Sequence, residues 1–589
     1  MTPAGNAAST VRSAGRSAES PLPDLLEALE QLRAQVASLS LALDVDGVDD
    51  CRRDRDGLVS QFDDYLLPRL RRPNAPLLAV IGGSTGAGKS TLINSLLGQE
   101  VSRSGVLRPT TRSPVLVHHP SDTGSFLSQR ILPRLTRVTS EEPEPLQPID
   151  PNAPRITGLR LVPHYGLPPG LAIIDAPDID SLVETNRDLA VQLLQAADMW
   201  IFVTTAARYA DAMPWRLLSQ AAERGATVAV VLNRVPPEAF QELRIDLAGR
   251  LRQRGLPGTP LFTILETRTS DGFLPDPMVA TLRKWLHRVS GDPRSRAMIV
   301  ERTLRGTLRT VPDRVRALVA AAEVQANSWI QLRDQVHTVF GVAINRLPVI
   351  FTDGGLVTGE VLARWQEFVA DGGFFRSLDS PAVKVTDRVR AAFRRAPEAG
   401  APLDIPVTQS VTDAIRSSVQ KATDEVLDRW RRLPHGRGLL ELRGPQVTDT
   451  DVEVRLERAV RDWRLEVSGR IVCAVEAADS GAPPELRVDL QTVSDVVFIM
   501  VIDQRAELGD TGSPASATVA AARHILEQYL GTEAVARLVT AARADLLSRA
   551  AVLLDNERRR LQRLLDSEDS VIGRGDALRV AMELVEATG

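Results

Sequence analysis

The sequence predicts an α/β domain with a mostly parallel sheet covered by helices on both faces, joined to a large α-helical bundle region. Two observations support this fold class. Short apolar runs alternate with helical segments between residues 72 and 295, which is typical of strands buried on both faces. Beyond residue 295 the apolar residues recur at helical spacing almost throughout.

Composition and charge exclude several classes of protein. The 589 residues are 43% apolar and 25% charged, as in a globular chain of several domains. The 71 basic and 75 acidic residues leave a net charge of −4, so we expect no DNA partner. Every window of 18 residues contains a charged residue, which argues against a membrane-spanning helix. Two cysteines and the lack of an apolar leader predict a cytoplasmic protein.

The N-terminal segment divides into a tail and a pair of helices. Residues 1–20 are small and polar, and we expect them to be a disordered tail. Residues 21–71 are predicted to form N-terminal helices that join the bundle. The first carries a coiled-coil-like apolar seam, and the second runs from Asp54 to Leu67 and ends before Pro68. The seam consists of Leu25, Leu29, Leu32, Val36, Leu39 and Leu43.

The segment 72–295 contains five apolar runs that we predict to be strands. Since they alternate with helical segments, a parallel sheet is expected. The runs are Leu77–Ile81, Leu171–Ile174, Trp200–Val203, Thr227–Leu232 and Leu261–Leu265.

The remainder, divided into helical regions 296–440 and 441–589, is predicted to be α-helical. Turn clusters rich in glycine and proline separate the predicted helices. The expected helices are 296–335, 356–370, 382–395, 408–432, 451–477, 515–529 and 532–567.

A phosphate-binding loop follows the first predicted strand. Gly83-Ser84-Thr85-Gly86-Ala87-Gly88-Lys89-Ser90 fits the pattern G-x-x-x-x-G-K-[ST], and Thr91 continues into a predicted helix. Backbone N–H groups of such a loop cradle phosphate oxygens at a helix N-terminus. Lys89 would reach the β- and γ-phosphates, and the Ser90 hydroxyl would ligate Mg²⁺. The chain has only four lysines, so a lysine at this position is unlikely to be a coincidence.

A carboxylate ends the second apolar run. Asp175 follows Ile174 directly, in the arrangement that holds Mg²⁺ beside the γ-phosphate. Together with the phosphate loop, it predicts a site for a nucleoside triphosphate with Mg²⁺.

Three further motifs carry a resemblance to a known family. They are Arg108-Pro109-Thr110-Thr111-Arg112-Ser113-Pro114, Asp175-Ala176-Pro177-Asp178, and Val230-Val231-Leu232-Asn233-Arg234. At these residues the chain resembles the dynamin superfamily of GTPases, and bacterial dynamin-like proteins in particular. The resemblance implies GTP as the nucleotide, Mg²⁺ as its metal and hydrolysis as the reaction.

The resemblance also implies residue roles. Thr111, with Thr110 as an alternative, would coordinate Mg²⁺ and contact the γ-phosphate through its backbone; Lys89 and Thr111 would thus serve catalysis. Asn233 would bind the base, with the Arg234 stem on its face. The metal ligands would be Ser90, Thr111 and Asp175.

The sequence departs from the family pattern at three places. Asp178 stands where GTPases usually carry glycine, although its backbone N–H can still meet the γ-phosphate. Pro236 stands where an aspartate reads guanine, and Glu238 or Glu266 are candidates to replace it. Thr85-Gly86 stands where dynamins carry a Gln-Ser pair, and Ile179 leaves no water-orienting glutamine. We therefore expect slow intrinsic hydrolysis that dimerisation across the nucleotide face accelerates.

The helical half leaves three functions open. The first, which we favour, is a dynamin-like mechanoenzyme in which nucleotide-dependent dimerisation is coupled to a helical stalk and remodels membranes from the cytoplasmic side. It would be a homodimer or a hetero-oligomer with a related dynamin-like protein and would act peripherally at the inner face of the plasma membrane. The others are a soluble regulatory GTPase of the ribosome-associated kind and a nucleotide-binding scaffold with negligible turnover. The apolar segment Val496–Ile502 is expected to be core rather than a membrane-dipping tip. The arginines at 558–560 and 563 are expected to form a solvated helix face.

Overall fold

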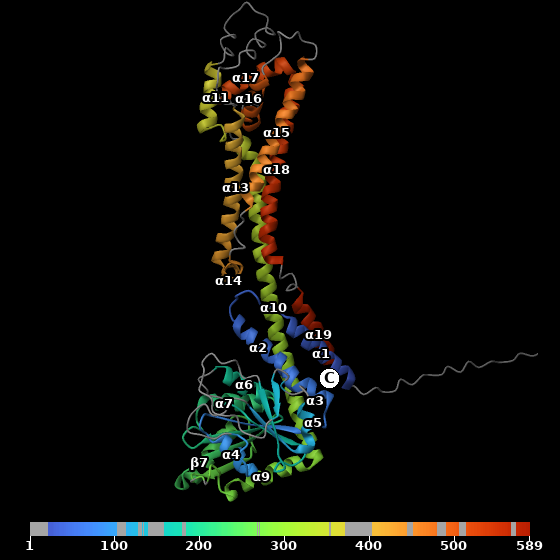
Figure 1. Cartoon of the computed structure of the whole chain (residues 1–589), viewed down its shortest axis with the longest axis vertical. Coiled ribbons are helices and arrows are strands. Elements are labelled where there is room, and N and C mark those ends of the chain that lie inside the picture. Colours follow the sequence, from blue (N-terminus) through green and yellow to red (C-terminus); the bar gives the residue numbers. More distant parts are fainter. Residues whose placement is uncertain are drawn as a thin grey trace, which may run out of the picture. The chain divides into compact units, whose positions relative to one another are not determined.

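The chain forms two compact units, which are described separately (Figure 1). The computed structural model describes residues 22–102, 114–127, 132, 135–139, 158–178, 184–267, 269, 271–352, 355–371, 403–444, 451–479, 490–505, 514–566 and 573–588. The first unit takes its residues from Met1–Leu41, Gly47–Glu323 and Ile572–Gly589. The second takes them from Ala42–Asp46 and Val324–Val571. The N-terminal helices and the C-terminal helix therefore belong to the same unit as the sheet.

The first unit contains an eight-stranded sheet in the order β3-β4-β2-β5-β1-β6-β7-β8. All neighbouring strands are parallel except β2 and β5, so the predicted fold class is confirmed. Each of the five predicted strands is present, and three more were not predicted. The predicted ones are β1 (Leu77–Gly83), β5 (Leu171–Asp175), β6 (Met199–Thr205), β7 (Thr227–Val235) and β8 (Leu261–Leu265). The others are β2 (Val115–His118), β3 (Thr136–Thr139) and β4 (Gly158–Pro163).

Helices cover both faces of the sheet, because alternate residues of each strand point to opposite sides. Leu77, Ala79 and Ile81 of β1 join a core with α4 (Lys89–Leu97) and α9 (Asp276–Gly291). Leu78 and Val80 join the opposite core. That second core includes α5 (Thr123–Leu127), α6 (Glu184–Ala196), α7 (Ala212–Glu223) and α8 (Phe240–Gln253).

The N-terminal helices differ from their prediction at both ends. Helix α1 (Leu22–Ser38) stops before Leu39, so Leu39 and Leu43 are buried but lie outside the helix. Helix α2 (Val48–Gln61) continues through a π-helical turn, η1 (Phe62–Leu66), into α3 (Leu67–Arg71). The predicted stop before Pro68 is therefore wrong. In the π turn the Leu67 N–H donates to the Phe62 carbonyl. Pro68 lies near the start of the next helical segment, where the missing N–H of a proline does not remove a helical hydrogen bond.

Helix α1 packs against α19 (Arg574–Thr588), which the sequence analysis did not predict. Of the seam residues, Leu43 shares a core with Leu538, Leu546, Leu553, Leu561 and Leu564. The part of the seam on α1 lies in the first unit, with the sheet, although residues 21–71 were predicted to join the bundle.

A buried ion pair joins α3 to the sheet. The Arg69 guanidinium pairs with Asp198, which precedes β6, and also donates to the Pro76 carbonyl at 2.8 Å. Asp198 accepts the Leu78 N–H at 2.8 Å. Burial, followed by the charge of Asp198, raises the pKa of Tyr65 on η1. The N-terminal helices are thus attached to the sheet by groups that are all withdrawn from water.

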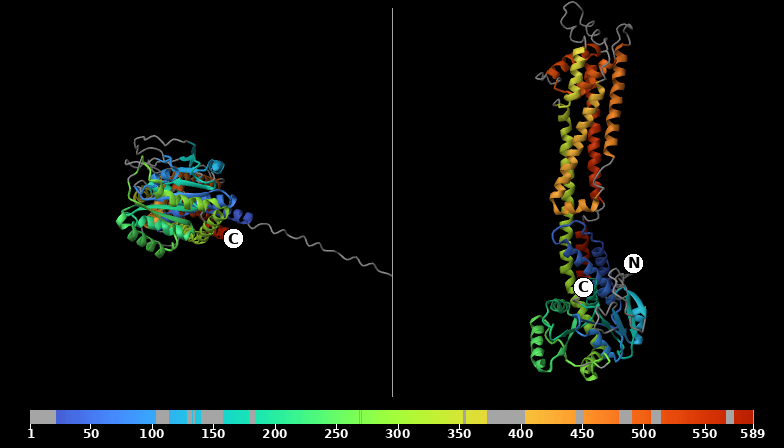
Figure 2. Two further views of the ribbon diagram at one scale, coloured as in Figure 1. Left: turned by 90° about the horizontal axis from the view of Figure 1, so that it is seen from below. Right: turned by 60° about the vertical axis from the view of Figure 1, so that its left-hand side comes forward.

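The second unit is a helical bundle whose long helices run alongside one another (Figures 1 and 2). Helix α10 (Pro293–Thr352) begins in the first unit and is longer than the predicted 296–335. The others are α11 (Gly359–Asp371), α13 (Asp404–Arg432), α14 (Pro434–Arg443), α15 (Val452–Asp479), α16 (Leu490–Ile502), α17 (Pro514–Leu530) and α18 (Thr532–Asp566). The predicted helix 382–395 lies outside the described residues.

The most apolar segment of this unit is part of its core, as expected. Helix α16 is buried from Val496 to Ile502, and Phe498 meets Trp463 edge to face with ring centroids 5.6 Å apart. The arginines at 558–560 are paired along α18: Arg558 and Arg559 with Asp555, and Arg560 with Glu557. Among the described residues, no helix is long and apolar enough to cross a bilayer.

Candidate functional site

The phosphate loop connects β1 to α4 at the edge where parallel strands end. A Cβ on Gly83 would overlap the Val203 carbonyl of the neighbouring strand, and one on Gly88 would lie 2.6 Å from the Asn233 side-chain nitrogen. Gly86 and Gly88 also have left-handed backbones, with φ of 76° and 92°. Glycine is therefore required here for both space and conformation. The strand–loop–helix context of the motif is as predicted.

Lys89 lies inside the loop. Its side chain is 6% exposed, and Nζ donates to the carbonyls of Gly83 at 3.0 Å and Ser84 at 3.3 Å. The same ammonium pairs with Asp178. A γ-phosphate would compete with the Asp178 carboxylate for this cation, so the residue that replaces the usual glycine lies directly at the site.

Ser90 and Asp175 lie together, as the metal prediction requires. The Ser90 hydroxyl donates to Asp175 Oδ2 at 2.7 Å, and the Ser102 hydroxyl donates to the same oxygen at 2.6 Å. Burial raises the pKa of Asp175, while these two hydrogen bonds and Lys89 oppose the increase. Asp175 Oδ1 is buried and has no partner among the described residues. A hard cation or its water shell would satisfy that oxygen, so the donor set fits Mg²⁺.

Ser102 was missed by sequence reasoning. It follows the first helix of the domain, where no motif marks it. It is held near Asp175 by Asn94, whose side-chain amide accepts the Ser102 N–H at 3.0 Å and donates to its carbonyl at 2.6 Å. The one signal in the sequence was Asn94, a polar residue between the apolar pairs Leu92-Ile93 and Leu96-Leu97 of α4.

Asn233 connects the predicted base-reading motif to the phosphate loop. Its side-chain nitrogen donates to the Ala87 carbonyl at 2.8 Å, and its oxygen accepts the Arg234 N–H at 2.9 Å. Arg234 has a left-handed backbone, with φ of 54°, and lies exposed. Glu238 and Glu266 are also exposed.

Arg208 also reaches the loop and was not predicted. It lies in the turn that follows β6, and its Nη1 donates to the Thr85 carbonyl at 3.2 Å. The predicted switch residues Thr110 and Thr111 and the residue Ile179 lie outside the described residues. The other predicted site residues lie at or beside the carboxyl ends of the parallel strands; they are Gly83–Thr91, Asp175, Asp178, Asn233 and Arg234.

Comparison with known proteins identifies the domain. The segment 78–235, from the second residue of β1 to the last of β7, matches the family model described as "Dynamin family". In sequence, this segment is similar to the GTPase domain of the dynamin family. Among curated proteins, none is significantly similar to the chain in sequence.

Solved structures resemble the chain only distantly. A chain from a study of an oligomerised bacterial dynamin pair in membrane sensing and tethering is 10% identical, with 95% of each chain covered and a TM-score of 0.40. Era, in complex with MgGDPNP and part of 16S ribosomal RNA, is 20% identical over 36% of this chain and 57% of its own, with a TM-score of 0.23. Toc33 from Arabidopsis thaliana, with Mg²⁺ and GMPPNP, is 16% identical over 41% of this chain and 92% of its own, also at 0.23.

Proposed function

We propose that the dynamin-family domain binds GTP with Mg²⁺ and hydrolyses it slowly, and that dimerisation across the nucleotide face accelerates turnover. The observation that carries the proposal is the convergence of Lys89, Ser90 and Asp175 on the phosphate loop, with distances of 2.7 Å from Ser90 to Asp175 and 3.0 Å from Lys89 to Gly83. This set matches the parts that position and neutralise a triphosphate.

Each residue has a separate task in this proposal. Loop N–H groups hold the phosphates, and Lys89 exchanges Asp178 for the β- and γ-phosphate oxygens. Ser90 and Asp175, with Thr111, hold the metal, which when bound neutralises charge on the β- and γ-phosphates. Asn233 holds the loop at Ala87 and contacts the base. The stem of Arg234 packs on the face of the base. Because Pro236 removes the usual carboxylate, guanine selectivity is expected to be modest.

Phosphate release with GTP and with ATP tests the proposal. Wild-type protein should release phosphate from GTP in a Lys89-dependent manner, so Lys89→Ala should abolish turnover. Lys284→Ala is the matched control, because Lys284 is an exposed lysine on α9 of the same unit. Equal affinity for ATP and GTP would count against GTP as the nucleotide. If wild-type turnover were no higher than that of Lys89→Ala, the protein would instead be a nucleotide-binding scaffold with negligible turnover.

Self-association is tested by the dependence of turnover on concentration. We expect the rate per molecule to rise with protein concentration, alone or with a related dynamin-like protein. Concentration-independent turnover contradicts this part of the proposal. Liposome flotation with and without GTP tests a peripheral contact with the inner face of the plasma membrane. Helix α16 is not expected to make this contact, because it is buried in the core of the second unit.

A further inference from the structure

Arg208 is held at the phosphate loop by its own turn. Its backbone N–H donates to the Thr205 carbonyl at 3.0 Å, and its Nε donates to Asp211 at 3.0 Å. Thr205 pairs with Asn233 in the register of β6 and β7. The turn therefore emerges from the same sheet edge as the predicted nucleotide-binding residues.

The contact with Thr85 places the guanidinium beside the loop that is predicted to bind the phosphates. Thr85 is the third residue of the loop that starts at Gly83, and the N–H groups of that loop are expected to face the phosphates. Nη1 of Arg208 lies 3.2 Å from the Thr85 carbonyl oxygen. The side chain is 40% exposed, so it can move from the carbonyl to a neighbouring phosphate without leaving a packed interior.

Guanidinium chemistry fits the reaction at this point. Arginine is always charged and offers five N–H donors in a planar fork that matches phosphate oxygens. Hydrolysis forms a bond from water oxygen to the γ-phosphorus and breaks the bond to the β–γ bridging oxygen, while the water proton leaves with the released phosphate. In the transition state the negative charge is spread over the equatorial oxygens of the transferred group, and a nearby guanidinium stabilises it without gaining or losing a proton.

We propose that Arg208 is the cation that stabilises the γ-phosphoryl group in the transition state, acting within its own chain. This inference rests on the proposed function as a GTPase. Arg208 supplies a positive charge in a site where Thr85-Gly86 and Ile179 offer no side chain to assist hydrolysis. Lys89, the other cation at the loop, is oriented toward Gly83, Ser84 and Asp178.

A purely structural role predicts a different result. The pair between Arg208 and Asp211 is half-exposed, and such pairs contribute little to stability. If Arg208 merely held the loop, its removal would weaken the binding of every nucleotide and slow turnover in proportion, and Asp211→Asn would act similarly.

The test compares Arg208→Ala, Arg208→Lys and Asp211→Asn with Arg305→Ala, an exposed arginine paired with Glu301 on α10. For Arg208→Ala we expect single-turnover hydrolysis of GTP to fall by about a thousandfold or more. Affinity for GDP should stay within about threefold, whereas the added affinity for GDP with aluminium fluoride should be lost. Free guanidinium should restore part of the rate, and Arg208→Lys should recover less than wild type because it lacks the fork.

Three outcomes overturn the assignment. One is that Arg208→Ala hydrolyses GTP at the wild-type rate while Lys89→Ala is inactive. This result would refute the role of Arg208 and leave the proposed GTPase activity intact. Another is an equal loss of GDP affinity and of rate in both Arg208→Ala and Asp211→Asn, which shows a structural role. The third is a wild-type protein whose phosphate release does not depend on Lys89, which contradicts the proposed function as well.

Discussion

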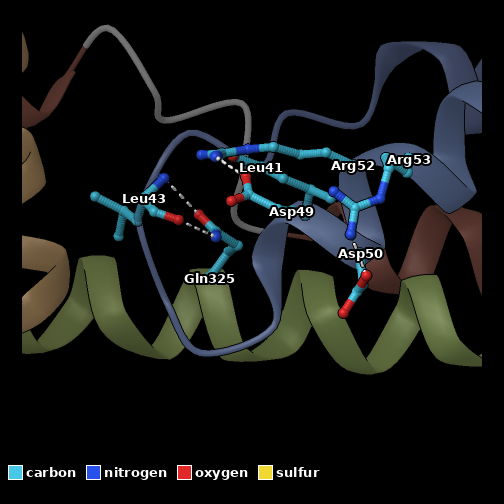
Figure 3. Close-up of polar contacts among 7 residues, drawn as sticks. All are labelled: Leu41, Leu43, Asp49, Asp50, Arg52, Arg53 and Gln325. Atoms are coloured by element: carbon cyan, nitrogen blue, oxygen red, sulfur yellow. Dashed lines mark hydrogen bonds and ion pairs between the residues drawn. The ribbon is translucent and has the colours of Figure 1, made fainter. Parts of the chain in front are cut away.

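The side-chain amide of Gln325 replaces a backbone partner for Leu43. Its Nε2 donates to the Leu43 carbonyl at 2.8 Å, and its Oε1 accepts the Leu43 N–H at 3.0 Å (Figure 3). Gln325 is fully buried on α10, and Leu43 belongs to the core of the same unit. A non-helical segment thus enters a helical core with both backbone groups satisfied, as buried polar groups require.

Replacing Gln325 by leucine should therefore destabilise the second unit. The backbone N–H and C=O of Leu43 would lose their partners, at a cost of about 1–3 kcal/mol each. Chemical denaturation followed by tryptophan fluorescence measures the loss. Gln331→Leu is the matched control, because Gln331 is exposed on the same helix. Equal stability of the two variants would show that the hydrogen bonds contribute nothing.

Gly88→Ala should disable the phosphate loop. The new Cβ would lie 2.6 Å from the Asn233 side-chain nitrogen, and φ of 92° adds strain of about 1–2 kcal/mol. We expect GTP affinity to fall at least about tenfold, a loss of roughly 1.4 kcal/mol or more. Calorimetric titration with a slowly hydrolysed GTP analogue measures it.

Gly98→Ala separates strain from steric overlap. Gly98 also has a left-handed backbone, with φ of 71°, but a Cβ there meets nothing within 4 Å. It should lose a comparable 1–2 kcal/mol of stability from strain, while GTP affinity stays within about twofold. If both variants bind GTP equally well, the contact between the loop and Asn233 is not needed for binding.

Arg69→Met should destabilise the first unit strongly. The change leaves the Asp198 carboxylate buried without its cation, which costs about 3–5 kcal/mol. Adding Asp198→Asn should recover part of the loss, because the amide is neutral and can still accept the Leu78 N–H. Urea titration of the single and double variants measures the coupling.

The control for this pair is Arg305→Ala. Arg305 and Glu301 are both 65% exposed, and such surface pairs are worth about 0–1 kcal/mol. A similar loss from Arg69→Met and Arg305→Ala would mean that burial does not strengthen the pair between Arg69 and Asp198.

Phe498→Ala should destabilise the second unit in the absence of any lipid. The ring is fully buried against Trp463, and truncating a buried phenylalanine costs about 3–5 kcal/mol. Denaturation in lipid-free buffer measures it, with Leu490→Ala as the control because Leu490 is 41% exposed at the start of the same helix. Unchanged stability combined with reduced liposome binding would instead support a membrane role for α16.

The amino-acid sequence determined the local geometry of the phosphate loop. A phosphate loop is a contiguous string whose glycines, lysine and serine act through local backbone geometry, so Gly83–Ser90 were predictable. Asp175 and Asn233 end long apolar runs, and parallel strands bring their ends to the same edge. The long helices were also predictable, because the period of their apolar residues repeats over many turns.

Only the tertiary structure decided which distant segments meet. Sequence spacing does not indicate that α1 packs against α19, that Gln325 completes the hydrogen bonds of Leu43, or that Ser102 joins Ser90 on Asp175. Short strands such as β3 have too few residues for a periodic signal, and the π turn before Pro68 depends on packing that propensity does not include. Arg208 has no motif around it. Its relation to Thr85 exists because β6 and the phosphate loop end at the same edge of the folded sheet.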